Sequence, residues 1–425
     1  MEKIVTSLKG TRDFYPEDMA IRSWLYNKLR EVSESFGYQE YDGPFLEKLD
    51  LYAAKSGEEL VKEQAFVFPD RGGDLITLRP ELTPTLARMV AQRQHQLVYP
   101  LRWWSFGPFW RYERPQKGRT REFFQWNIDL IGSNTPQSDA ELIAICAAFF
   151  VRVGLKPEQV GIFVNDRRLM NSQLGRIGIE GDEQRKLVFR LVDRRDKLPP
   201  ADWDAFVLES GLTGVQLDNL KRILDNRELW RESEELSQVF AALEVLGAMP
   251  YVRFDPQIVR GLDYYTGTVF EARDLDREGR AILGGGHYDN LVEAVGGESL
   301  PGVGFAMGDV MIRLMLEKYG CLPEFKPSPA DILVTVFDRE LLTQSLKVAA
   351  KLRDADFKVS CFTEEIKLPR QMKYADKMGI RFVVIIGPDE YANQAATVKD
   401  LTSGQQATAS LDALVDLIRQ WQRLD

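Results

Sequence analysis

Hydrophobic and polar residues alternate along residues 122–130, as they do in a β-strand with two different faces. One face is mostly apolar and includes Phe124 and Trp126, whereas the other includes Gln125 and Asp129. Burying amides and carboxylates without partners is costly. The polar face of this strand is therefore expected either to meet water or to recognise a polar ligand.

A strongly basic segment lies between this strand and a preceding predicted strand, which ends near Arg111. Residues 111–121 carry five cations, against only two acids in or directly after this stretch, Glu113 and Glu122. Guanidinium groups suit bidentate phosphate binding, so a basic loop beside a polar strand face predicts a polyphosphate next to a small polar molecule. A solvated hairpin with internal Arg–Glu pairs remains the alternative. The five cations are Arg111, Arg114, Lys117, Arg119 and Arg121.

Hydrophobic spacing divides the rest of the chain into segments of different character. Apolar residues three and four positions apart predict a helix from about Glu17 to Phe36, and helical periods with charged stretches dominate residues 165–245. The second region is interpreted as a mostly helical insertion, which from composition alone could equally be a passive appendage. Beyond a proline-rich linker, apolar runs such as 332–337 alternate with amphipathic helices, which predicts a small parallel or mixed α/β domain.

The composition is ordinary for a globular protein, with 44% hydrophobic and 28% charged residues among 425. A net charge of −9 disfavours non-specific coating of nucleic acid, so an RNA partner would have to use local basic patches. Three scattered cysteines lack metal-ligand spacing, and two histidines exclude a multi-histidine metal site. Because there is no membrane-length apolar run and no signal-peptide pattern, we expect a cytoplasmic protein with reduced thiols and no membrane partner.

Four strings, taken together, resemble a known family. Residues 110–125, WRYERPQKGRTREFFQ, resemble motif 2 of class II aminoacyl-tRNA synthetases in the wording of the histidyl-tRNA synthetases. Residues 260–271, RGLDYYTGTVFE, are similar to the histidine-specific motif of that family, which other class II synthetases lack. LRPELT at 78–83 resembles its RPEGT-like signature, and residues 36–47 resemble motif 1, the family's dimer interface.

The resemblance runs from Lys9 to the end of the printed sequence and implies a fold. It implies an α+β catalytic domain with a class II synthetase-like antiparallel sheet and helices, a helical insertion, and a C-terminal α/β domain like those that bind anticodons. The expected domains are 1–164 for the first part of the catalytic core, 165–248 for the insertion, 249–322 for the second part of the core, and 330–425 for the C-terminal domain.

The implied function is ATP-dependent ligation of L-histidine to tRNA(His) through a histidyl-adenylate. ATP is then a substrate, Mg²⁺ bridges its phosphates, and the chain is expected to form a homodimer. Two alternatives remain: a non-catalytic synthetase-like regulatory subunit of ATP phosphoribosyltransferase in histidine biosynthesis, and a synthetase of the same subclass for another amino acid. The sequence does not identify metal-binding residues.

By carry-over from the family, each matched position has an expected role. The catalytic cations are Arg111 and Arg260, which we expect to converge on one nucleotide. The histidine-binding residues are Glu81, Thr83, Gln125, Asp129, Tyr264 and Tyr265. The ATP-binding residues are Arg111, Glu113, Arg119 and Gly304. The tRNA-binding residues are Arg114, Gln116, Lys367, Arg370, Lys373 and Lys377.

Some of these residues also have structural interpretations. Pro80 is predicted to open a helix with Glu81 in its first turn, so helix initiation is an alternative role for Glu81. The cations from Lys367 to Lys377 share one side of a predicted helix, and a solvated face is the alternative to RNA binding.

The chain departs from the family pattern most clearly at two positions. Met311 stands where motif 3 has the arginine that meets the ATP γ-phosphate, and Arg313, two positions on, is rotated by about 200° and is expected to point away. His287 stands where the family pattern GGRYD has arginine, and we interpret it as a packing or hydrogen-bonding substitute. Both departures favour the regulatory-subunit alternative slightly.

Overall fold

The computed structural model describes residues 4–53, 64–259, 264–276, 281–325 and 328–423. The chain divides into two compact units. The larger comprises residues 1–13 and 22–323, and the smaller comprises 14–21 and 324–425. Among the described residues, no helix is long and apolar enough to cross a membrane.

The larger unit is built on an eight-stranded sheet in the order β1-β5-β6-β11-β10-β9-β7-β8. Its central pairs are antiparallel, and only β1–β5 and β7–β8 are parallel. The strands are β1 Gln39–Glu40, β5 Leu101–Trp110, β6 Glu122–Ile131, β7 Val160–Asp166, β8 Val252–Phe254, β9 Thr268–Asp274, β10 Leu283–Tyr288 and β11 Gly302–Gly308.

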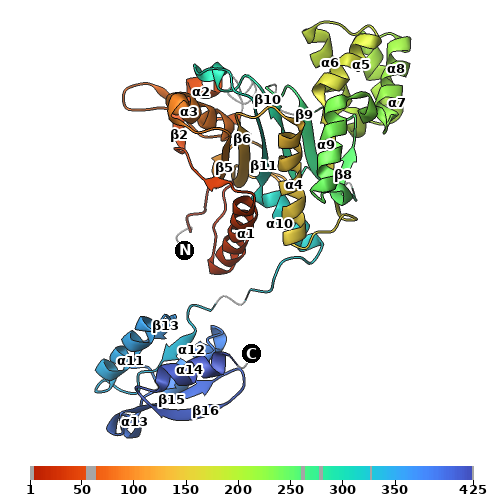
Figure 1. Cartoon of the computed structure of the whole chain (residues 1–425). Coiled ribbons are helices and arrows are strands. Elements are labelled where there is room, and N and C mark those ends of the chain that lie inside the picture. The colour runs from red at the N-terminus through yellow and green to blue at the C-terminus, as the bar shows by residue number, and fades with distance from the viewer. Residues whose placement is uncertain (1–3, 54–63, 260–263, 277–280, 326–327, 424–425) are drawn as a thin grey trace. The chain divides into compact units, whose positions relative to one another are not determined.

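Helices cover the apolar face of this sheet (Figure 1). α4, Pro136–Arg152, lies across β6, β7 and β11, and α10, Asp309–Lys318, packs beside β6. α1, Pro16–Ser35, buries Leu25, Leu29 and Val32 in the same core, as the apolar repeat predicts. Trp126 on β6 is fully buried there, because its side chain points away from the polar face of the strand.

A three-stranded sheet in the order β2-β4-β3 contains an antiparallel hairpin of β3 and β4; the strands are β2 Leu46–Lys48, β3 Phe66–Pro69 and β4 Leu75–Leu78. α2, Leu49–Ala53, follows β2. The prediction that Pro80 opens the next helix is wrong, because α3 spans Thr83–Arg93 and has Pro84 in its first turn. Residues 79–82 instead form a connection held against the end of β5.

The region after β7 is helical, as predicted, and clusters with the eight-stranded sheet in one unit. β7 itself runs across the expected domain boundary at 164/165. α9 packs on α4, whereas α5 to α8 lie at the upper right of Figure 1. The helices are α5 Arg167–Arg176, α6 Asp182–Asp193, α7 Pro200–Glu209, α8 Gly214–Asp225 and α9 Glu234–Val245.

The smaller unit is a mixed α/β domain, as the apolar runs predict. β12 is parallel to β13 and β14, and β15 and β16 extend the sheet antiparallel in the order β13-β12-β14-β15-β16. The strands are β12 Ile332–Val334, β13 Val359–Cys361, β14 Phe382–Ile385, β15 Ala395–Asp400 and β16 Gln406–Ser410. The helices are α11 Leu342–Asp354, α12 Leu368–Lys377, α13 Pro388–Ala392 and α14 Leu414–Gln422.

Candidate functional site

A cavity of about 290 Å³ opens on the polar face of the eight-stranded sheet. β6, β9, β10 and β11 form its floor, and residues 81–83 and 264–265 form part of its wall. All six residues predicted to bind histidine line this one cavity: Glu81, Thr83, Gln125, Asp129, Tyr264 and Tyr265. The alternation along β6 therefore identifies the polar face correctly.

A second cavity, of about 130 Å³, lies beside the basic loop. Its lining includes Glu113 and Arg119 from the loop and Met311 from α10. Arg111 lines both cavities, so its side chain lies where the larger cavity meets the second cavity. Gly304, predicted to bind ATP, lines the larger cavity rather than the smaller one.

Backbone contacts explain why Glu81 and Arg111 lie together. Arg111 donates from Nε to the Pro80 carbonyl at 2.9 Å, and the Trp110 amide donates to the Arg79 carbonyl at 3.1 Å. The fully buried Arg79 side chain donates to Asp42 at 2.6 Å and to the Pro108 carbonyl at 3.0 Å. These bonds hold residues 79–82 at the end of β5 and keep the helix from starting at Pro80.

Asp129 is a buried carboxyl in the larger cavity, and its pKa is strongly shifted. The residue is only 4% exposed, and burial raises the pKa of its carboxyl to about 7, although a hydrogen bond from the Tyr288 hydroxyl at 2.9 Å opposes that shift. Gly304 lies directly opposite in the β6–β11 register, and a Cβ there would overlap the Asp129 carboxylate. The missing side chain at 304 therefore makes room for Asp129.

Two tyrosines close the opposite wall. Their rings meet edge to face at 5.0 Å, and the Tyr264 hydroxyl hydrogen-bonds to Thr83 and to Tyr265. Burial raises the pKa of both phenols, so both stay protonated at neutral pH and can donate. Arg167 fixes their turn by donating to the Tyr265 carbonyl at 2.5 Å.

The basic loop packs closely against the second cavity. Glu113 is buried and pairs with Arg119. Gly118 has a φ of 78°, and a Cβ there would overlap the Met311 sulfur, so the tip of the loop rests on Met311. Arg114 and Gln116 are exposed on this loop.

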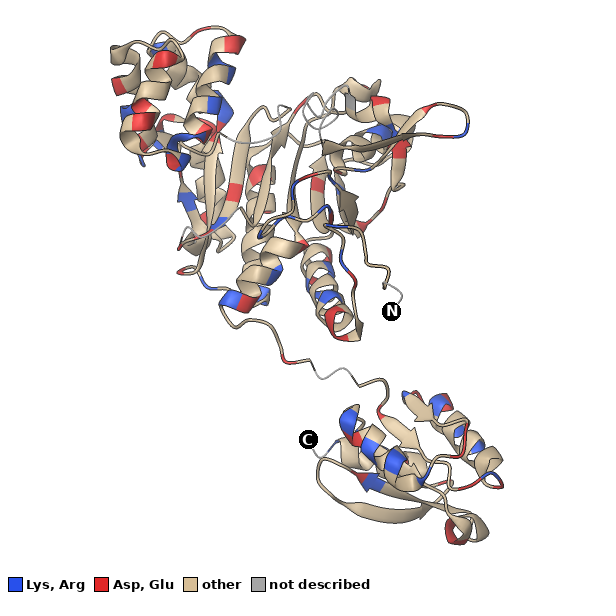
Figure 2. Ribbon diagram, turned by 180° about the vertical axis from the view of Figure 1, so that it is seen from behind, with Lys and Arg blue, Asp and Glu red and all other residues tan. Residues whose placement is uncertain are grey.

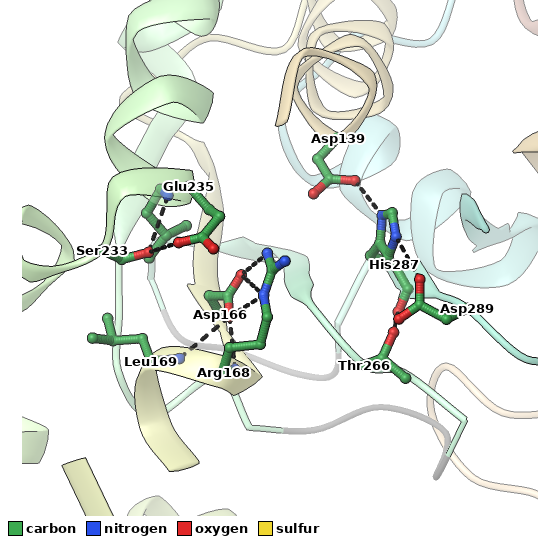
Figure 3. Close-up of polar contacts among 10 residues, drawn as sticks. Asp139, Asp166, Arg168, Leu169, Ser233, Glu235, Thr266, His287 and Asp289 are labelled. Atoms are coloured by element: carbon green, nitrogen blue, oxygen red, sulfur yellow. Dashed lines mark hydrogen bonds and ion pairs between the residues drawn. The ribbon is translucent and has the colours of Figure 1, made fainter. Parts of the chain in front are cut away.

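The structure confirms the two expectations for the departing positions. Arg313 donates to Glu317 at 2.9 Å along the outer side of α10 and is absent from the lining of either cavity. His287 is buried and hydrogen-bonded, with Asp139 and Asp289 beside its two ring nitrogens (Figure 3).

Several residues with a predicted role line neither of these two cavities or lie outside the described residues. Arg260 lies outside the described residues, so its convergence with Arg111 stays a prediction. The four C-terminal cations are exposed along or beside α12, in the smaller unit (Figure 2). They are Lys367, Arg370, Lys373 and Lys377.

Several residues that line the larger cavity are not among the predicted site residues. Asn127 was already visible on the polar face of the strand, between Gln125 and Asp129. No comparable sequence pattern indicated Tyr288 or Glu271, because each follows an apolar or glycine-rich run that is typical of a buried strand. Within the described parts of the chain, no three His, Cys, Asp or Glu residues are grouped to hold a metal ion.

Two family models match the chain: "Histidyl-tRNA synthetase" over residues 10–310 and "Anticodon binding domain" over residues 331–421. A histidine–tRNA ligase of Arabidopsis thaliana, designated chloroplastic/mitochondrial, is 38% identical over 96% of this chain and 85% of its own length.

Solved structures agree with these matches. A histidyl-tRNA synthetase from Nostoc sp. PCC 7120 has a TM-score of 0.82 at 27% identity, covering 99% of this chain and all of that one. A Bacillus halodurans protein described as an ATP phosphoribosyltransferase regulatory subunit/histidyl-tRNA synthetase has a TM-score of 0.74 over 91% of this chain and 99% of its own. At 23% identity, that second likeness shows the fold alone.

Proposed function

The chain belongs to the histidyl-tRNA synthetase family, and on that premise we propose that its two adjoining cavities bind histidine and ATP side by side. Its activity is the ligation of histidine to tRNA. The observation that carries the proposal is the position of Arg111, which lines both cavities. A cation there meets the histidine carboxylate and the ATP α-phosphate at once, which is what formation of a histidyl-adenylate requires.

The larger cavity selects histidine through hydrogen bonds. Asp129 accepts from one imidazole nitrogen, and the protonated phenol of Tyr265, which itself accepts from Tyr264, donates toward the other side of the substrate. Glu81, with Thr83 and Gln125 nearby, receives the α-ammonium. A site built on hydrogen bonds rejects analogues that lack them by a larger factor than an apolar pocket does.

The smaller cavity holds the phosphates. In-line attack of the histidine carboxylate spreads negative charge over the α-phosphate, and fixed guanidinium groups in a site shielded from water stabilise that charge. Arg111 and, by the family resemblance, Arg260 supply these guanidinium groups. Arg119, which pairs with Glu113, faces the departing pyrophosphate. The role of Gly304 is to admit Asp129 and so to shape the boundary between the two substrates.

A magnesium ion fits the donors of the smaller cavity. Mg²⁺ is usually bound through one or two carboxylates together with substrate phosphates, and Glu113 is the only acid among the described residues that line this cavity. When bound, the ion neutralises phosphate charge. Glu113 would be its protein ligand, released in part from Arg119 as the phosphates arrive.

Two basic surfaces serve the tRNA. Arg114 and Gln116 are exposed at the basic loop, next to the cavity where the aminoacyl group forms, and they suit the acceptor end. The exposed cations of α12 suit the anticodon arm, since they lie in the segment that matches the anticodon-binding family. Local cations are needed because the whole chain carries a charge of −9.

Homodimerisation is supported by an exposed apolar surface on the three-stranded sheet. Phe45, Leu46, Phe68 and Leu75 are between 40% and 52% exposed, near the segment that resembles motif 1. Leu46 and Phe68 share one face of this sheet, because they pair with Leu78 and Ile76 of β4, and exposed apolar residues gathered on one face are typical of interaction sites. Light scattering of wild type and Phe68→Glu tests the proposal: a dimer that dissociates in the variant supports it, and an unchanged mass contradicts it.

We propose that the reaction takes place in the cytoplasm, in keeping with bacterial and archaeal histidine–tRNA ligases that match 99% and 96% of this chain. Fractionation of the source cells, with immunodetection of the protein, tests this location. Recovery in a membrane or organelle fraction contradicts it.

The decisive assay is amino-acid-dependent ATP–pyrophosphate exchange with all twenty amino acids. We expect exchange with histidine alone, and near-complete loss in Arg111→Ala with the fold retained. Exchange driven by another amino acid would contradict the substrate assignment. The second candidate, a regulatory subunit, is favoured only by Met311 and His287; it predicts stoichiometric binding to a phosphoribosyltransferase and no exchange.

A further inference from the structure

His287, on β10, is held by carboxylates at both ring nitrogens. It is only 3% exposed, and Nδ1 lies 2.8 Å from Asp139 Oδ1 while Nε2 lies 3.3 Å from Asp289 Oδ1 (Figure 3). Ionised carboxylates only accept hydrogen bonds, so both ring nitrogens must donate. The geometry is therefore that of an imidazolium cation.

The charges around the ring favour the same form. Burial lowers the pKa of His287, but the hydrogen bond and charge of Asp139, together with Asp289, outweigh burial and raise it. Arg168, on α5, opposes this shift. Its guanidinium is paired with Asp166 at 2.6 Å, which limits that repulsion (Figure 3).

The backbone around His287 supports the histidine pocket. Side chains of adjacent strand residues point to opposite faces, so Tyr288 reaches into the cavity while His287 faces α4. The Tyr288 hydroxyl donates to Asp129 at 2.9 Å. The His287 carbonyl accepts from the Thr266 amide at 2.8 Å, which anchors the turn that carries Tyr264 and Tyr265.

We propose that His287 is a positioning residue for histidine binding, acting as a cation fixed between Asp139 and Asp289. By anchoring β10 to α4, it sets both the Tyr288 hydroxyl on Asp129 and the turn with the two tyrosines. It touches neither substrate. The proposal rests on the proposed function, in which Asp129 receives the imidazole of the substrate.

Two substitutions separate the charge of His287 from its general polarity. His287→Gln keeps a hydrogen-bonding side chain but no charge, and we expect it to raise the KM for histidine about tenfold, the scale of one lost hydrogen bond to a charged group. The KM for ATP should stay within about twofold of the wild-type value, because no described residue of β10 lines the smaller cavity, where we propose that the phosphates bind. His287→Arg restores a cation and should return the histidine KM to within about threefold of wild type.

The measurement is histidine-dependent ATP–pyrophosphate exchange with full-length protein. The matched control is His95→Gln, because His95 is the other histidine of the chain and is exposed. A histidine KM in His287→Gln that equals that of wild type overturns the proposal. So does an arginine variant no better than the glutamine variant, or an equal rise in both KM values.

Two further variants keep the test conclusive. If His287→Gln unfolds, Asp289→Asn replaces it, since the Asp289 side chain is 41% exposed and its loss removes only one partner. That variant should raise the histidine KM about threefold, and no rise overturns the proposal. Asp129→Asn distinguishes a failure of the proposed function from a failure of this inference. If Asp129→Asn leaves the histidine KM unchanged, the assignment of the histidine pocket and this inference both fail. If it raises the histidine KM while His287→Gln does not, this inference alone fails.

Discussion

Replacing Asp129 by asparagine should stabilise the free protein at alkaline pH while weakening histidine binding. Burial raises the carboxyl pKa from 3.8 to about 7 in the folded protein. The unfolded chain therefore releases this proton at lower pH than the folded one, and stability falls as pH rises from about 4 through 7. The full penalty is the difference of roughly three pKa units, or about 4 kcal/mol at pH 8.

Asparagine avoids that penalty because it is neutral and nearly the same size. The stability gap between variant and wild type should grow by about 3 kcal/mol between pH 5 and pH 8. Urea unfolding followed by tryptophan fluorescence measures it, since seven of the eight tryptophans belong to the larger unit. Asp376→Asn, at an exposed position on α12, is the control and should show no such trend.

Ligand binding provides the second half of this prediction. Histidine should stabilise the wild type through binding to the folded state, and it should stabilise the Asp129→Asn variant much less. A stability gap that does not change with pH, or a variant less stable than wild type at pH 8, would show that Asp129 is not a buried ionised group. The account of the pocket would then be wrong.

Three other variants test separate parts of the site. Gly304→Ala should weaken histidine binding more than tenfold, since its Cβ displaces Asp129; calorimetric titration with histidine measures this affinity, and an unchanged value contradicts the prediction. Arg111→Lys keeps the charge but loses the Nε bond to Pro80, so exchange should fall about a hundredfold; near-normal exchange removes the clamp. Lys373→Glu with Lys377→Glu should raise the KM for tRNA at least about fivefold and leave exchange unchanged; equal aminoacylation kinetics would favour a merely solvated helix face.

The histidine pocket was largely predictable because its main wall follows a simple period. Gln125 and Asp129 lie two and six residues from Phe123 along one strand, so alternation alone places them on one face. The C-terminal strands were equally accessible, because short apolar runs buried on both faces have few other interpretations.

Tertiary contacts explain what local pattern did not predict. α3 begins at Thr83 and not at the predicted Pro80, because Arg111, some thirty residues away, donates a hydrogen bond to the Pro80 carbonyl. One of the two partners of His287, Asp139, is 148 residues distant, so nothing near position 287 identifies it. Tyr288 was missed for the same reason, since its role depends on Asp129 in a strand that is not adjacent in sequence.

The most direct test of the account is a crystal structure of the protein with a non-hydrolysable histidyl-adenylate analogue. We predict that the imidazole of the analogue lies within hydrogen-bond distance of Asp129 and that the guanidinium of Arg111 contacts the group replacing the α-phosphate. An imidazole bound away from Asp129, or an Arg111 that contacts neither half of the analogue, would contradict the claim that the two cavities form one site.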